Sequence, residues 1–171
     1  SISSTVTTAP TLEAYGAVLS CLARSVRWYS NERQKEATAR QAESLLQEMQ
    51  DEYHIVPNTL LYAHVLHAWA QTSAPQAGEH AEAILNHMLR QYYDEHKTPR
   101  KDLITSNKPN NYCFSAVMTA YAKQGRVQKV QDLLHQLQRL YEGTQHHGED
   151  PDFLPNAFCF NALIEAWANN N

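Results

Sequence analysis

Glycine is scarce in this chain. Only 5 glycines occur among 171 residues, and they are too scattered to form the glycine-rich loop that holds phosphate groups in nucleotide-binding enzymes. The sequence contains neither an HExxH motif, which would indicate a zinc hydrolase, nor a GxSxG motif, which would indicate a nucleophilic serine on a sharp turn. We therefore expect neither enzymatic activity nor a cofactor.

Long hydrophobic runs and a surplus of positive charge are missing as well. The most apolar stretch, residues 60–70, is interrupted by His64 and His67 and is shorter than the roughly 18 to 20 residues that span a membrane. Lys and Arg number 14 against 18 Asp and Glu, which gives a formal net charge of −4. We expect no membrane association, and any contact with nucleic acid must depend on a local patch of positive charge.

Cysteine is rare, and the spacing of the cysteines matches no disulfide or metal-binding motif. The three cysteines, Cys21, Cys113 and Cys159, show no CxxC spacing, and each lies inside an apolar pattern of helical period. Thiols in such a setting are typically buried and reduced. The sequence thus predicts three buried, free cysteines in a reducing compartment.

The chain repeats itself. Four segments, which start at Pro10, Pro57, Pro109 and Pro155, align without gaps, and in each an aromatic residue follows the proline by five positions. An apolar pair comes three and four residues after the aromatic, and an alanine about four residues later, so these residues share one face of an α-helix. The residue after each proline can cap that helix with its side chain: Thr11, Asn58, Asn110 and Asn156.

A second amphipathic helix follows the first three segments. Its apolar residues recur at i, i+3, i+4 and i+7, as in Val130, Leu133, Leu134 and Leu137. Each unit is therefore a helical hairpin, and Gly125 and Gly143 suit the ends of the two helices of the third unit. We predict an all-α chain of about seven helices, in which the hairpins stack into an α-solenoid with a concave side.

The predicted units run over residues 10–56, 57–108 and 109–154, and residues 155–171 form the first helix of a fourth unit. The units are longer than two helices require, so we assign the excess to loops over 25–36, 96–108 and 144–154. We expect the chain to be a fragment of a longer array. Any targeting signal lies upstream or has been removed, because the chain starts with Ser1 and lacks a basic stretch leading into an apolar one.

The third unit resembles a pentatricopeptide repeat almost residue for residue. The residues that carry the resemblance are Lys108-Pro109-Asn110, Tyr112-Cys113-Phe114-Ser115-Ala116-Val117-Met118, Ala120-Tyr121-Ala122-Lys123-Gln124-Gly125-Arg126, Val130 and Leu133-Leu134. The resemblance extends, more weakly, from Pro10 to the end. It implies a right-handed α-solenoid that binds single-stranded RNA, one base per unit, in the groove lined by the first helices. It also implies a mitochondrial or plastid protein of RNA processing, stability or translation.

The resemblance also implies roles for individual residues. The pairs that hydrogen-bond to a base edge would be Gly16 with Asn58, Ala63 with Asn110, and Ser115 with Asn156, and Asn161 would begin a fourth pair. Ser115 with Asn156 is similar to the combination that prefers adenine, while Gly16 and Ala63 offer no side-chain hydrogen bond. The residues that would sandwich a base are Leu60, Tyr112 and Phe158, and the cations that would meet phosphate are Arg24 and Lys123.

Other interpretations stay open at this point. The same solenoid could be a scaffold that binds other proteins, and an electronegative first-helix surface would favour that function. His64 and His67 stand one helical turn apart, as metal ligands would, although polar positions facing solvent or the groove explain them better. The cluster at 146–152 could bind a cation and the basic run at 96–101 could touch phosphate, but both are more typical of solvated loops.

The tryptophans divide into two kinds. Trp69 and Trp167 occupy the same register of their repeats, so we expect both to pack between helices. Trp28 lies in a predicted insertion and is the better candidate for an exposed contact.

Overall fold

The computed structural model describes residues 10–95, 107–144 and 151–170, and within them every regular element is helical. The α-helices are α1 (Leu12–Ser25), α2 (Glu32–Asp51), α3 (Thr59–Ala70), α4 (Ala77–Glu95), α5 (Asn111–Ala122), α6 (Val127–Thr144) and α7 (Ala157–Asn169). Two short 3₁₀ helices, η1 (Val26–Trp28) and η3 (Pro151–Phe153), lie in the connections. The predicted all-α fold of about seven helices is confirmed.

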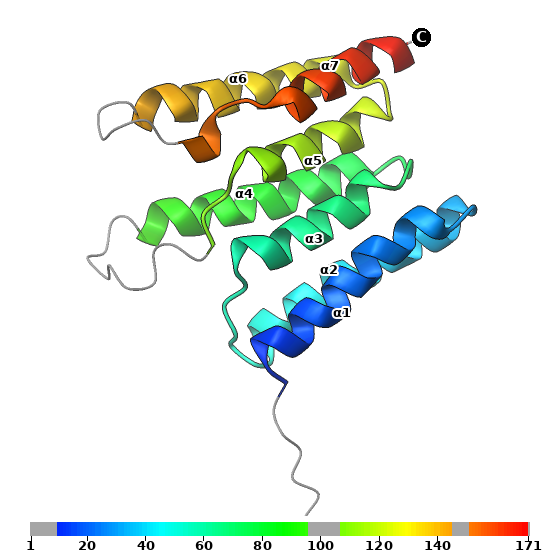
Figure 1. The fold of residues 1–171 in the computed structure, drawn as a ribbon, viewed down its shortest axis with the longest axis vertical. Coiled ribbons are helices and arrows are strands. Elements are labelled where there is room, and N and C mark those ends of the chain that lie inside the picture. The colour runs from blue at the N-terminus through cyan, green and yellow to red at the C-terminus, as the bar shows by residue number, and fades with distance from the viewer. Residues whose placement is uncertain (1–9, 96–106, 145–150, 171) are drawn as a thin grey trace, which may run out of the picture.

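The helices form a stack of hairpins, α1 with α2, α3 with α4 and α5 with α6, and α7 follows at the end of the stack (Figure 1). The first helices α1, α3, α5 and α7 contact one another in chain order and form a wall. Each of α3, α5 and α7 also contacts the second helix of the preceding unit. This arrangement is the helical-repeat solenoid that the sequence predicts, whereas the exact unit boundaries remain a prediction.

The first helices begin where the sequence predicts, because the capping side chains satisfy N–H groups of the first turn. Thr11 Oγ1 accepts from Ala14 N at 3.2 Å, and Asn58 Oδ1 accepts from Leu61 N at 3.0 Å. Asn110 and Asn156 each accept from two backbone N–H groups at 3.0 to 3.2 Å. Such a cap stabilises a helix by about 1 kcal/mol.

The repeated apolar positions form one continuous core. The aromatic and the apolar pair of α3 and α5 are fully buried: Tyr62, Val65, Leu66, Phe114, Val117 and Met118. Polar contacts of matching register join neighbouring units, since Trp69 Nε1 donates to Glu43 at 3.1 Å and the Tyr121 hydroxyl donates to Glu82. The second and third units are therefore each held to the preceding one by apolar burial and by a bond from the first helix to the previous second helix.

Several local predictions are wrong for reasons of packing. Cys21 is exposed, although Cys113 and Cys159 are buried as predicted. Trp167 is 54% exposed while Trp69 is buried, because no second helix covers this face of α7 within the described residues. Gly143 lies one residue before Thr144, the last residue of α6.

The connections differ partly from the predicted loops. Residues 32–36 belong to α2, so the loop between α1 and α2 is shorter than the predicted 25–36 and includes η1. Gly125 has a φ of +66°, a left-handed conformation that suits the turn after α5, as predicted. The predicted loop at 96–108 lies almost wholly outside the described residues, as does the start of the loop at 144–154.

Candidate functional site

A groove lies on the wall of first helices, between α3, α5 and α7. Figure 1 shows these three helices following one another in the stack. Its cavity has a volume of about 590 Å³. The residues that line it are Ala63, His64, His67, Ala70 and Gln71 of α3 and its C-cap, Tyr112, Ser115, Ala116 and Thr119 of α5, and Phe158 of α7. The groove brings together four residues singled out from the sequence: Ala63, Tyr112, Ser115 and Phe158.

Two aromatic rings stand at this groove with their faces available. Tyr112 and Phe158 are each 60% exposed, and their ring centroids are 6.2 Å apart with an interplanar angle of 48°. A flat ring inserted between two others needs about 7 Å, twice the usual carbon contact distance of about 3.5 Å. The pair would therefore have to open by only about 1 Å and align to hold a nucleobase. Leu60, at the same register of α3, is 61% exposed.

The polar groups at the groove are already partly engaged. Ser115 is buried, and its hydroxyl donates to the carbonyl of Tyr112 at 3.0 Å. The Oδ1 atom of Asn156 caps α7, and its Nδ2 atom is buried without a hydrogen-bond partner among the described residues. Asn156 does not line the groove and its Nδ2 atom is buried, so this donor is not presented to a ligand in the groove.

The other proposed base-contacting residues present fewer free polar groups to the groove. Asn58 and Asn110 use their Oδ1 atoms as helix caps in the same way as Asn156. Gly16 and Ala63 present no polar side-chain atom, and Gly16 faces Leu61 across α1 and α3. Asn161 is exposed on α7 but does not line the groove.

The predicted phosphate-contacting cations lie where the first helices end. Arg24 is exposed in the last turn of α1, and Lys123 forms the C-cap of α5. Burial lowers the pKa of Lys123, and the nearby Glu165 carboxylate opposes that effect. Gln71 occupies the equivalent place after α3, where its Nε2 lies 3.3 Å from Nε2 of His67.

His64 and His67 of α3 line the groove. This agrees with the interpretation of both as polar positions that face solvent or the groove. Burial lowers the pKa of His64 and of His67, and the charges of Arg27 and Lys123 lower the pKa of His67 further. Among the described residues no three His, Cys, Asp or Glu side chains form a group that could hold a metal ion. The cluster at 146–152 lies mostly, and the basic run at 96–101 entirely, outside the described residues.

Arg27 is a cation near the groove that sequence reasoning missed. It belongs to η1 and not to a repeated position, so the register of the repeats could not place it. The connection that contains η1 lies on the side of the stack where α3 ends (Figure 1), and the charge of Arg27 lowers the pKa of His67. The only signal in the sequence is that it stands next to Trp28 in an insertion.

The wall formed by the first helices has almost no net charge, and the excess of Asp and Glu over Lys and Arg lies on the second helices. Along the first helices and their caps, Glu13 and Glu165 are balanced by Arg24 and Lys123. Acidic residues outnumber basic ones on α2 and α4, which belong to the other layer. An electronegative first-helix surface would have favoured a protein scaffold. The first-helix surface is not electronegative, so its charge does not favour that function.

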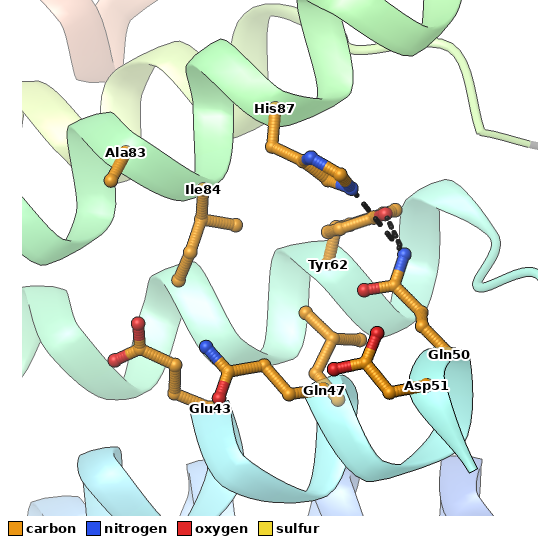
Figure 2. Close-up of a pocket in the computed structure, with 9 residues that line it drawn as sticks. Glu43, Gln47, Gln50, Asp51, Tyr62, Ala83, Ile84 and His87 are labelled. Atoms are coloured by element: carbon orange, nitrogen blue, oxygen red, sulfur yellow. Dashed lines mark hydrogen bonds between the residues drawn. The ribbon is translucent and has the colours of Figure 1, made fainter.

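A second, smaller cavity of about 300 Å³ lies between α2, α3 and α4 (Figure 2). Figure 2 shows Gln50 reaching from α2 toward α3 and α4, where its Nε2 donates to the Tyr62 hydroxyl at 2.9 Å and lies 3.5 Å from Nε2 of His87. Burial lowers the pKa of His87. None of the site residues predicted from the sequence lines this cavity, so the groove remains the candidate site.

Comparison with known proteins supports the interpretation of the repeats. Residues 112–141, which span nearly all of α5 and most of α6, match the family model described as a PPR repeat. No curated protein and no solved structure matches the chain. Within the described residues no helix is long and apolar enough to cross a membrane. The match shows one pentatricopeptide repeat, over α5 and α6, within a stack of helical hairpins; proteins with such repeats generally bind RNA.

Proposed function

We propose that the groove binds single-stranded RNA with sequence selectivity and that the protein acts by binding, without catalysing a reaction. The observation that carries the proposal is the pair of exposed rings of Tyr112 and Phe158, which come from neighbouring units and are 6.2 Å apart at the groove. Stacking on aromatic side chains is the usual way in which proteins hold unpaired bases. A base between these rings would lie close to Ser115.

Selectivity would come mainly from the third unit. Ser115 supplies a hydroxyl at the groove, and the resemblance implies that Asn156 would contact the base edge together with it and that adenine would be preferred there. The units that contain Gly16 and Ala63 would discriminate little, because neither residue has a polar side-chain atom. Lys123 and Arg24 would neutralise phosphates at the C-terminal ends of the first helices. Residence in a mitochondrion or plastid, and a role in RNA processing, stability or translation, complete the proposal.

The aromatic pair can be tested with a matched control on the same helix. We expect Phe158→Ala to weaken binding of labelled single-stranded RNA by about 5- to 150-fold, since stacking contributes about 1–3 kcal/mol per base. Phe160→Ala is the control, because Phe160 is 47% exposed but does not line the groove. Fluorescence anisotropy at low salt measures both. Equal losses in the two variants, or no RNA binding by the wild-type chain, would refute the proposal.

Two further variants examine charge and selectivity. Lys123→Gln should reduce the slope of log affinity against log salt by about 0.7, the value for one phosphate contact on a single strand. Ser115→Ala should narrow the difference in affinity between RNAs that carry different bases at the corresponding position. A salt slope that is the same in Lys123→Gln and wild type would remove Lys123 from the binding surface.

A protein-binding function is the second candidate. It is favoured by the exposed apolar face of α7, formed by Phe160, Ile164 and Trp167, which is covered at the same register in α3 and α5. Binding of a protein through this face would be lost in Trp167→Ala and kept in Phe158→Ala, the reverse of the order expected for RNA in the groove.

A further inference from the structure

The connection between α1 and α2 exposes an aromatic and a cationic side chain that lie outside the groove. Trp28 is 80% exposed, more than any other large apolar side chain in the described residues. The guanidinium of Arg27 lies 5.8 Å from the centre of its ring. Val26 is buried and packs with the core, so η1 is anchored to the helices. An exposed ring beside a cation suits one unpaired nucleotide, whose base stacks while its phosphate meets the charge.

This turn lies on the edge of the solenoid where the groove ends. In Figure 1 the connections α1–α2, α3–α4 and α5–α6 lie along one side of the stack. Hydrogen bonds link them in a row, because Glu32 at the start of α2 accepts from Ser73 N at 2.8 Å and Gln124 donates to the carbonyl of Ala74 at 3.1 Å. Arg27 is also close enough to His67, which lines the groove, for its charge to lower the pKa of that histidine.

The other units have no equivalent of this pair. The connection between α3 and α4, residues 71–76, contains neither an aromatic residue nor a Lys or Arg, and residues 123–126 contain no aromatic. The register of the repeats therefore does not account for Trp28. We propose that η1 is an additional nucleotide-binding element, in which Trp28 stacks on a base of the RNA strand next to the segment in the groove and Arg27 contacts its phosphate. This inference rests on the proposed RNA binding.

The test compares two exposed tryptophans in the whole chain. Trp28→Ala should weaken binding of labelled single-stranded RNA of mixed sequence by about 5-fold or more, and Trp28→Phe should retain most of the affinity. Trp167→Ala is the matched control, because Trp167 is also exposed but stands at the register of the buried Trp69, away from the groove lining. Arg27→Gln should lower the salt slope by about 0.7, whereas Arg139→Gln on α6 should not.

The length of the RNA separates this element from the groove. As the RNA is shortened, the effect of Trp28→Ala should disappear before that of Phe158→Ala, because the proposed nucleotide lies beyond the groove. If Phe158→Ala weakens binding at every length and Trp28→Ala weakens it at none, the inference about η1 is wrong and the groove proposal stands. If the wild-type chain binds no RNA, both are wrong. Unchanged thermal unfolding of Trp28→Ala would show that the loss of affinity is not a loss of fold.

Discussion

Gly78 has no room for a side chain, and replacing it by alanine should destabilise the protein. Gly78 is buried in the first turn of α4, where an added Cβ would lie 2.3 Å from Cδ1 and 2.4 Å from Cε1 of Tyr121. These contacts are far shorter than the roughly 3.5 Å at which carbon atoms attract one another. The Tyr121 ring cannot move away freely, because it is fully buried and its hydroxyl donates to Glu82.

The expected magnitude follows from two opposing effects. Alanine is favoured over glycine inside a helix by up to about 1 kcal/mol. Forcing extra volume into a packed core costs about 1–3 kcal/mol, and loss of a hydrogen bond to a carboxylate costs about 1.5–3 kcal/mol more. We therefore expect Gly78→Ala to lower the free energy of unfolding by about 1.5–5 kcal/mol. For a chain of this size each kcal/mol corresponds to a fall in Tm of about 2–4 °C.

A matched substitution on α6 gives the opposite sign. Gly143 also lies in a helix, but nothing stands within 4 Å of an added Cβ, so Gly143→Ala should be neutral or stabilising by up to about 1 kcal/mol. Urea unfolding followed by circular dichroism measures both variants against wild type. If Gly78→Ala proves as stable as Gly143→Ala, the close packing of α4 on Tyr121 is wrong.

Three further predictions concern single groups. Burial holds the pKa of His64 and of His67 below the ordinary 6.5, so these side chains take up protons more readily in the unfolded chain than in the folded one. Stability should therefore fall as the pH drops through 6.5. Thermal unfolding of the double variant His64→Gln/His67→Gln should depend less on pH in that range. A thiol reagent should label Cys21 in the folded chain but not Cys113, which is buried and whose pKa burial raises to about 11; the mass of the labelled protein shows how many thiols reacted. Asn110→Ala should lose about 1 kcal/mol of stability in urea, and Asn110→Asp, which keeps the capping oxygen, should lose much less.

The parts of the fold that were predictable from the sequence depend on short-range patterns. The capping residues and the apolar stripes act within one or two helical turns, so their spacing predicts where helices start and which face is buried. Whether the side chains of Cys21 and Trp167 are buried or exposed depends on neighbouring units, and both are exposed. Their registers match those of Ala68 and Trp69, which are buried, but Cys21 is in the first unit and Trp167 in the last. A repeat pattern describes a unit in the middle of a stack and says less about its ends.

The candidate site was predictable to the extent that it follows the repeat. Tyr112, Ser115 and Phe158 were placed by register, and the structure brings them to one groove. The location of Arg27 and Trp28 was not predictable in this way, because η1 has no counterpart in the other units. The unsatisfied Nδ2 of Asn156 could be recognised only in three dimensions, since the sequence shows the cap but not what surrounds the other amide atom.

The geometry of the groove depends on the junctions between units as much as on the residues that line it. Tyr112 and Phe158 belong to different units, so the 6.2 Å between their rings is set by how α7 packs on α5. Two bonds outside the groove hold that junction, from Asn111 Nδ2 to the carbonyl of Leu154 at 2.8 Å and from Asn169 Nδ2 to the carbonyl of Ala122 at 3.1 Å. A change at such a junction alters the space available to a base without removing any group that contacts it. Affinity for RNA and stability of the stack are therefore coupled through the spacing of the units.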